Sequence, residues 1–432
     1  MTFEQPLSQP WFAESISDNL ELTGCGVRFI YAIKKEKCVT TDNDRPLKGV
    51  RVLDLATFVA APFAATIMGE FGAEVIKVEH PSGGDPMRRF GTPTYDPELT
   101  LAWLSEARNK HSVTMDLKAP ADVEKFKALV ARSDVICENF RPGTLERWGL
   151  DWETLSTINP RLVMLRISGF GQDGPYRDRP GFARIAHAVG GLTYLACMPD
   201  GPPVTPGSTS LADYITGLYG AVGVLLALRV VEQTGHGQVI DAALYESIFR
   251  VLDELAPLYG KHGIVREPEG VGTRNACPHG HFVCGDGKWV AIACTADRIW
   301  ARMAENVLAQ PALATSHPTT QSRLADREMI EQTVEAFTKS LPMAEVVRLC
   351  NEGDVPCGAI NSIADIFDDP HFAARGTMID VVHDTVGKLT LPNVLPRLSA
   401  TPGSIDNLGP NLGDWNGERL EALLNDDSEI RK

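Results

Sequence analysis

Apolar positions recur along this chain with two different periods, and the two periods alternate through its first half. Short runs rich in β-branched residues predict buried β-strands at 49–55, 73–79, 112–117, 134–137, 162–167 and 239–244. Apolar residues spaced three and four apart predict helices at 63–71, 120–133, 212–232 and 245–259. Strands that alternate with helices indicate βαβ units. The predicted fold class is α/β with a mostly parallel sheet.

The pattern changes after about residue 262. Two short apolar runs flank Asp286-Gly287, a dipeptide typical of a tight turn, and predict a β-hairpin. Helical and strand-like patches then alternate without a clear βαβ repeat. We therefore expect a large domain at 47–262 and a smaller α+β domain at 263–392. The polar, irregular residues 1–46 are interpreted as an N-terminal extension, and 393–432 as a tail with a final helix.

Composition narrows the possible partners. The 432 residues are 44% hydrophobic and 22% charged, which is ordinary for a globular protein. The net charge of -15 argues against a nucleic-acid or anionic-membrane partner. The longest apolar stretch, 214–228, is interrupted by glycines and too short to span a bilayer. No export signal is seen and the nine cysteines follow no framework, so a cytoplasmic protein with reduced thiols is expected.

Two motifs resemble binding sites, for a dinucleotide and for a metal ion, but their surroundings in the sequence argue against both. Gly169, Gly171 and Gly174 match a dinucleotide-binding pattern, but a proline-rich loop follows where a helix should begin. A glycine turn near a ligand is therefore expected instead. The segment 277–284 holds two cysteines and two histidines, yet no second ligand cluster accompanies it, so no metal site is predicted.

Basic residues recur where the predicted strands end, which is where open α/β sheets bind ligands. They would pair the phosphates of a nucleotide-like ligand. The residues of this basic fringe are Arg88, Arg89, Lys110, His111, Lys118, Arg141 and Arg147.

Asp213 is the candidate nucleophile. It stands where a Pro/Gly-rich loop enters the long apolar helix, within GSTSLADYITG at 207–217. Helix-start N–H groups and the helix dipole favour an ionised carboxylate, and such a carboxylate in a pocket can attack an acyl group. An ordinary capping aspartate fits the same local pattern.

The ordered segments together resemble the class III (CaiB–BaiF type) CoA-transferases, the family of formyl-CoA transferase and carnitine CoA-transferase. They include LKGVRVLDLATFVAAPFAATIMGEFGAEVIKVEHPSGGDPMR, NKHSVTMDLKAPAD, VICENFRPGTLERWGL, RISGFGQDGPYRDRPGF, STSLADYITGLYGAVGVLLAL and GHGQVIDAALYES. The resemblance runs from about residue 47 to residue 408. It implies a Rossmann-like large domain, a small domain, a segment 393–432 that returns to the large domain, and an interlocked homodimer.

The resemblance also implies site residues. The catalytic aspartate of the family falls on Asp213. The positions that bind CoA fall on Val59, Ala60, His80, Met115, Lys118, Asn139, Phe140, Arg141, Arg147 and Phe182.

An acyl pocket is expected beside Ala183 and His187. Many members have an acidic residue where Ala183 stands, and His187 replaces a frequent glutamine. Arg184 and Arg274 are candidates to pair a second carboxylate of the substrate. A hydrogen-bonded core histidine is the alternative for His187.

The implied activity is an acyl-CoA:carboxylate CoA-transferase that works through aspartyl anhydride and aspartyl-CoA thioester intermediates. A small dicarboxylic acid and succinyl-CoA are the expected substrates. The CoA thioester is then a substrate, and no tightly bound cofactor is expected. A 2-methylacyl-CoA racemase is an alternative, although its histidine would fall on Phe182, which cannot transfer a proton. A non-catalytic CoA-binding protein is the other alternative.

Overall fold

A six-stranded parallel sheet forms the centre of the described chain. The structure is a computed structural model that describes residues 45–96 and 99–425. The strand order is β3-β2-β1-β4-β5-β6. The strands are β1 (Arg51–Asp54), β2 (Glu74–Glu79), β3 (Lys110–Thr114), β4 (Val135–Glu138), β5 (Val163–Ser168) and β6 (Val239–Ala243). This order confirms the α/β fold class and places the reversal of strand order between β1 and β4, where such sheets bind ligands.

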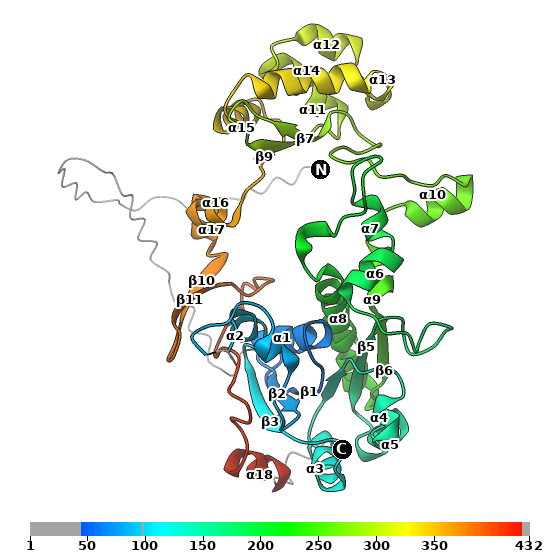
Figure 1. Cartoon of the computed structure of the whole chain (residues 1–432), viewed down its shortest axis with the longest axis vertical. Coiled ribbons are helices and arrows are strands. Elements are labelled where there is room, and N and C mark those ends of the chain that lie inside the picture. The colour runs from blue at the N-terminus through cyan, green and yellow to red at the C-terminus, as the bar shows by residue number, and fades with distance from the viewer. Residues whose placement is uncertain (1–44, 97–98, 426–432) are drawn as a thin grey trace, which may run out of the picture. The chain divides into compact units, whose positions relative to one another are not determined.

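Helices cover both faces of the sheet (Figure 1), and side chains alternate between the two faces along each strand. Val52 and Val135 face α1 (Ala60–Glu70) and α8 (Leu211–Thr234). Leu53 faces the opposite core, which contains side chains of α3 (Pro120–Val130), α5 (Trp152–Ile158) and α18 (Glu418–Asn425). Burial on both faces explains why the strands read as continuous apolar runs.

One predicted helix is wrong in extent. The segment 245–259 forms two helices, α9 (Leu244–Arg250) and α10 (Leu255–His262). The turn between them contains Asp253 with a φ of 50°. Aspartate tolerates this left-handed conformation better than most residues. The turn at Asp253 interrupts the helix, although the apolar period of the sequence continues across the turn.

The residues after 262 form a second sheet with its own apolar core. Its antiparallel strands are β7 (His279–Val283), β8 (Trp289–Ala293) and β9 (Cys357–Ala359), which confirms the predicted hairpin. Buried Trp300 packs in this core with side chains of α14 (Arg327–Lys339), a helix that the sequence analysis missed. The other helices here are α11 (Asp297–Arg302), α12 (Pro311–Ser316), α13 (Thr320–Ala325), α15 (Met343–Glu352), α16 (Ile363–Asp368) and α17 (Pro370–Arg375).

The C-terminal segment runs along edge strand β3. Asn407 Nδ2 donates to the Lys110 carbonyl at 2.9 Å, and the Gly413 N–H donates to Ser112 Oγ at 2.9 Å. The Trp415 ring stacks on His111 with centroids 3.8 Å apart. The segment thereby covers a strand edge that would otherwise be open for pairing. The domain boundaries remain predictions, and residues 1–44 lie outside the described part of the chain.

A hairpin of β10 (Met378–His383) and β11 (Gly387–Pro392) precedes this segment. Its Leu391 is buried in a core with Trp103 of α2 (Leu101–Glu106). The short helices α4 (Thr144–Arg147), α6 (Ala183–Val189) and α7 (Leu192–Leu195) complete the elements around the first sheet.

Candidate active site

A pocket of about 830 Å³ opens at the carboxyl ends of β1, β4 and β5, where the strand order reverses. Its wall combines the loops that follow these strands with the start of α8. The lining residues are Thr57, Phe58, Val59, Ala60, Asn139, Phe140, Arg141, Pro142, Ile167, Ser168, Gly169, Arg177, Arg179, Pro180, Gly181, Phe182, Asp213 and Leu244. We call this the Asp213 pocket, because Asp213 is the only acidic residue among them.

Asp213 is the third residue of α8, and Ser210 is the N-cap. The side chain of Ser210 makes no capping hydrogen bond, and no described residue donates a hydrogen bond to the Asp213 carboxylate. Burial raises the pKa of Asp213 to about 6. Desolvation thus opposes the ionised form that the helix start was expected to favour. At neutral pH the side chain is still about nine-tenths ionised.

The loop after β1 is held by side chains from elsewhere in the sheet. Asn139 accepts a hydrogen bond from the Thr57 N–H at 2.9 Å and donates one to the Thr57 carbonyl at 2.7 Å. Asp85 accepts one from the Phe58 N–H at 3.0 Å. Phe58 has a φ of 62°, a conformation that a bulky residue adopts only when its surroundings impose it. These contacts fix the pocket wall that precedes Val59 and Ala60.

A second pocket of about 690 Å³ shares Thr57 and Phe140 with the Asp213 pocket. His80, Met115 and Lys118 line it. Except for Arg147, the residues predicted to bind CoA are thus divided between two neighbouring pockets.

Two of those predicted residues have other contacts. Arg147 lines neither of these two pockets, and its guanidinium donates to Thr144 Oγ1 at 3.0 Å. The amide of Asn139 is occupied by the Thr57 backbone.

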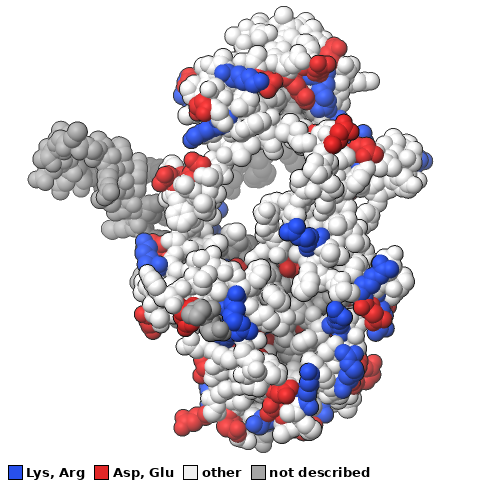
Figure 2. Space-filling view, in the orientation of Figure 1, with Lys and Arg blue, Asp and Glu red and all other residues white. Residues whose placement is uncertain are grey.

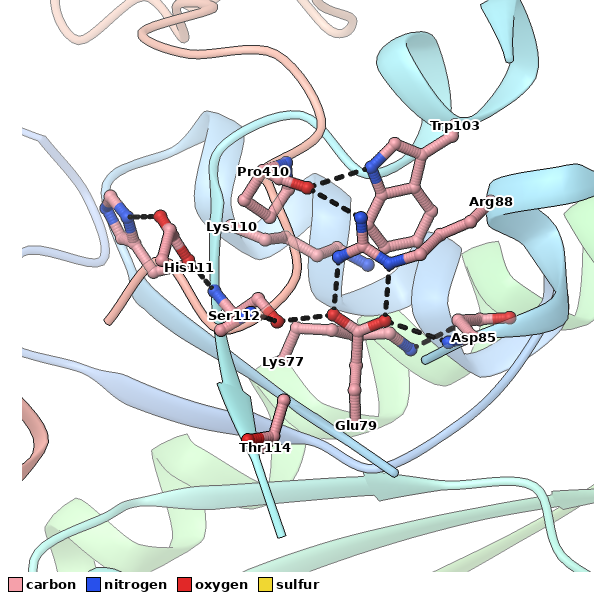
Figure 3. Close-up of polar contacts among 12 residues, drawn as sticks. Lys77, Glu79, Asp85, Arg88, Trp103, Lys110, His111, Ser112, Thr114 and Pro410 are labelled. Atoms are coloured by element: carbon pink, nitrogen blue, oxygen red, sulfur yellow. Dashed lines mark hydrogen bonds and ion pairs between the residues drawn. The ribbon is translucent and has the colours of Figure 1, made fainter. Parts of the chain in front are cut away.

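Part of the basic fringe is buried and paired inside the protein (Figure 3). Lys110 Nζ lies 2.8 Å from Asp54 and donates to the Pro62 carbonyl at 2.7 Å. Arg88 binds Glu79 through two nitrogens, at 2.9 and 2.6 Å. Both cations are buried and paired with carboxylates, so this part of the prediction of an open basic fringe is wrong. Lys118 and Arg141 do line the two pockets.

Lys77 belongs to the same buried network and contacts Asp85 at 2.9 Å. Burial alone would lower the pKa of Lys77, but the carboxylates of Asp54 and Asp85 raise it above its ordinary value. Lys77 therefore stays charged. Lys77 thereby holds the Asp85 carboxylate, which accepts the hydrogen bond from the Phe58 N–H.

The predicted acyl-pocket residues do not line the Asp213 pocket. Ala183 is buried at the start of α6, one residue after Phe182, and Arg184 is exposed. Arg274 pairs with Glu269 at 3.0 Å and lines a different pocket.

His187 is buried, and its Nε2 accepts a hydrogen bond from the Ala212 N–H at 3.0 Å. This contact agrees with the alternative of a hydrogen-bonded core histidine. It also connects α6 with the first turn of α8, which carries Asp213.

The glycine motif at 169–174 and the cysteine- and histidine-rich segment at 277–284 each include residues in closely packed surroundings. Gly169 lies against Gly181 so closely that a Cβ on Gly169 would come within 2.9 Å of its backbone, and the next helix begins only at Ala183. Cys277 and Cys284 are buried in the core of the second sheet. Among the described residues, no group of three or more His, Cys, Asp and Glu side chains is arranged to hold a metal ion.

Helix α8 is the one described helix that is long and apolar enough to cross a membrane by length and composition alone. With 24 residues, α8 is longer than the apolar stretch 214–228 identified in the sequence. Buried core helices have the same properties, and α8 packs on the sheet through Ala221, Val224 and Ala227. On the face drawn in Figure 2, acidic and basic side chains are interspersed over a mostly uncharged surface.

Comparison with known proteins gives consistent matches. A family model described as CoA-transferase family III matches residues 47–416. The chain is 57% identical over 388 residues to a succinyl-CoA–L-malate CoA-transferase beta subunit from Chloroflexus aurantiacus, covering 89% of this chain and 95% of the relative. An alpha subunit from the same organism is 54% identical over 392 residues, 90% of this chain and 91% of the relative.

The structure also resembles a crystal structure of a CAIB/BAIF family protein from Brucella suis. The TM-score is 0.77 at 33% sequence identity, with 88% of this chain and all of the other chain covered.

Proposed function

This chain belongs to CoA-transferase family III and is a CoA-transferase, and from that premise we propose that it transfers CoA from succinyl-CoA to a small dicarboxylate through Asp213. The observation that carries the proposal is the unpaired Asp213 carboxylate in the pocket at the strand-order reversal. An unpaired carboxylate with a raised pKa is a better nucleophile than one held by donors.

The reaction would proceed through two kinds of covalent intermediate on Asp213, an anhydride and a CoA thioester. The Asp213 carboxylate attacks the thioester carbonyl of succinyl-CoA, the C–S bond breaks, and an aspartyl anhydride and CoA thiolate form. The thiolate then attacks the Asp213 carbonyl, which releases succinate and leaves an Asp213–CoA thioester. The acceptor carboxylate attacks that thioester, the C–S bond breaks, and a second aspartyl anhydride and CoA thiolate form. The thiolate finally attacks the acceptor's acyl carbon, which releases the new acyl-CoA and the free Asp213 carboxylate. Each step exchanges one leaving group for one nucleophile, so no net proton is consumed.

Each tetrahedral intermediate carries an oxyanion that needs hydrogen-bond donors. Val59 and Ala60 form the start of α1 and line the same pocket as Asp213 at the start of α8. The first N–H groups of a helix have no partners inside that helix. We assign oxyanion stabilisation to these backbone groups.

The charge of the Asp213 pocket favours an anionic acyl group. Arg141, Arg177 and Arg179 line it, and Asp213 is its single carboxylate. A second carboxylate on the substrate would meet positive charge there. The two relatives named as succinyl-CoA–L-malate CoA-transferases support L-malate as the acceptor to test first.

The racemase alternative is less well supported. It requires a second proton-transfer group opposite Asp213. The pocket lining contains no His, Lys, Glu, Tyr or Cys, and Phe182 occupies the position where the histidine was expected. Asp213 alone cannot remove a proton from one face of a carbon and return one to the other.

A homodimer is part of the proposal. Leu218, Val222, Leu225 and Leu226 form an exposed apolar stripe along α8. Exposed apolar patches of this kind mark interfaces in soluble proteins, and the family resemblance implies two interlocked copies.

The test uses the intact protein with succinyl-CoA and L-malate, and mass spectrometry to detect malyl-CoA. Hydroxylamine added during turnover should convert the carboxylate in the Asp213 peptide into a hydroxamate. Asp213→Asn should give neither product while still binding CoA. Failure to label Asp213 with any CoA donor would support a non-catalytic CoA-binding protein. Exchange of solvent deuterium into C2 of a 2-methylacyl-CoA would support the racemase instead.

A further inference from the structure

The first turn of α8 lacks a cap from its own chain segment. Ser210 is the N-cap, but its side chain accepts no hydrogen bond from the turn. The Ala212 N–H, which a capping side chain commonly binds, donates instead to His187 Nε2 at 3.0 Å. We propose that His187 is a positioning residue that caps α8 from α6 and thereby sets the direction of the Asp213 carboxylate. This inference rests on the proposed role of Asp213.

The two peptide groups that flank Ala212, the residue before Asp213, are each held by a side chain. His187 binds the N–H of Ala212, and the Thr216 hydroxyl donates to the Ala212 carbonyl at 2.6 Å. Both side chains are buried, with exposed fractions of 1% and 0%. Asp213 follows Ala212 directly, so a rotation of either of these peptide groups would move the Asp213 side chain.

The support for His187 is itself rigid. Helix α6 packs against α9 so closely that a Cβ on Gly190 would meet Ile248 at 2.8 Å and the Tyr245 carbonyl at 2.9 Å. Side chains are constrained in such close-packed contacts. The cap is therefore a fixed feature of the scaffold, carried by the same helix whose N-cap, Phe182, lines the Asp213 pocket.

The hydrogen bond sets the tautomer of the ring. A nitrogen that accepts a hydrogen bond carries no proton, so the neutral His187 ring carries its proton on Nδ1. Nδ1 is buried and has no partner among the described residues. Burial and the nearby Arg184 lower the pKa of His187, which keeps the ring neutral and able to accept. His187 does not line the Asp213 pocket, so it is not proposed to touch substrate.

The experiment compares His187→Gln with His187→Asn. The glutamine oxygen reaches the position of Nε2, whereas the asparagine oxygen reaches only that of Nδ1. We expect His187→Gln to keep kcat within about threefold of the wild type and His187→Asn to lower it about 100-fold, the effect expected from a misplaced catalytic group. The KM for succinyl-CoA should change less than about threefold in both variants, because the lost interaction is not a substrate contact. His371→Asn, at an exposed position, is the control.

Hydroxylamine labelling of Asp213 should slow with kcat in His187→Asn, because formation of the first anhydride depends on the orientation of the carboxylate. Equal kcat values for the two variants, whether both high or both low, would overturn the inference. A raised KM with unchanged kcat would also overturn it, since that result identifies a substrate contact. CoA binding checks that each variant is folded. If His187→Asn does not fold, the result rests on folded His187→Gln: a low kcat overturns the inference, and a wild-type kcat supports it. Activity retained in Asp213→Asn would instead contradict the proposed function, whatever the His187 variants do.

Discussion

Asp213 is desolvated and yet has no hydrogen-bond donor among the described residues. Most buried carboxylates are paired, because an unpaired buried charge is costly. Asp54 and Glu79, by contrast, contact Lys110 and Arg88. This difference between the side chains supports the proposal that Asp213 is the nucleophile.

The pH dependence of the reaction should follow Asp213. Its pKa is raised to about 6, and the protonated form is not a nucleophile. We expect kcat/KM to be nearly constant above pH 7 and to fall about tenfold per unit well below pH 6. Initial rates measured from pH 4.5 to 8.5 would check this, with CoA binding as the control. A constant rate down to pH 5 would contradict the assignment.

Removal of the Asp213 charge should stabilise the fold. The folded-state pKa of about 6 lies above the ordinary 3.8, so the folded protein binds the Asp213 proton more tightly than the unfolded chain does. The stability that this proton contributes is lost as pH rises through 6. We expect Asp213→Asn to raise the free energy of unfolding at pH 8 by about 1–2 kcal/mol, below the full value of the shift because the side chain is partly exposed. Thermal unfolding at pH 8 and 4.5 measures this, and the gain should shrink at the lower pH.

At the scale of elements, the site depends on how closely α8 approaches α1. A Cβ on Gly217 would come within 2.6 Å of the Ala60 carbonyl oxygen. The backbone at Ala60 cannot move aside as a flexible side chain can. Gly217 therefore permits the contact that brings the start of α1 and the start of α8 to the same pocket.

Gly217→Ala should separate the two helices. We expect activity to fall about 10- to 100-fold, because small displacements of catalytic groups have effects of that size. The free energy of unfolding should fall by about 1–3 kcal/mol, as for an overpacked core. Gly223→Ala is the matched control on the same helix, since its Cβ would meet only the Ile240 side chain, at 3.1 Å. Equal activities of the two variants would show that the close approach at Gly217 is unimportant.

Arg88 links β2 to the C-terminal segment. Its guanidinium binds Glu79 and donates to the Pro410 carbonyl at 2.9 Å, as Figure 3 shows, and Trp103 Nε1 donates to the same carbonyl at 3.1 Å. Burial would raise the pKa of Glu79, but the hydrogen bond and charge of Arg88 hold it below its ordinary value.

Arg88→Met should leave the buried Glu79 charge without its main partner. We expect a loss of about 3–5 kcal/mol in the free energy of unfolding and easier proteolysis near 404–416. Glu79→Gln combined with Arg88→Met removes the uncompensated charge and should recover part of the loss. Urea denaturation and limited proteolysis would measure both effects. No recovery in the double variant would mean that the Pro410 contact, rather than the ion pair, supplies the stability.

At the scale of the whole molecule, the apolar stripe on α8 makes the oligomeric state testable. Leu226 is 65% exposed, and a charge there would oppose burial in the proposed homodimer. We expect Leu226→Glu to shift sedimentation towards the monomer at micromolar concentration. Tyr95→Glu introduces the same charge at a residue that is 95% exposed and outside α8, and it should leave sedimentation unchanged. A monomeric wild type would contradict the homodimer.

The sequence by itself determined the α/β class, the central strands and the candidate nucleophile. Buried parallel strands read as apolar runs. The stretch around Asp213 fits a capping aspartate equally well, and the ordered segments on both sides of it made it the candidate nucleophile. Its pKa and lack of a partner were beyond local reasoning, because desolvation depends on what surrounds the loop–helix junction. The missed α14 and the break at Asp253 show the same limit for elements, since packing and turn geometry override local periodicity.

Only the tertiary structure decided which polar residues face the ligand and which hold the scaffold. His187 binds a backbone group 25 positions away, Asn139 one 82 positions away and Arg88 one 322 positions away. No local pattern records such partners. A polar side chain buried by folding must find a hydrogen-bond partner wherever the chain brings one. That requirement gives His187 and Asn139 backbone contacts beside Asp213 and its pocket, and it joins Arg88 to the C-terminal segment.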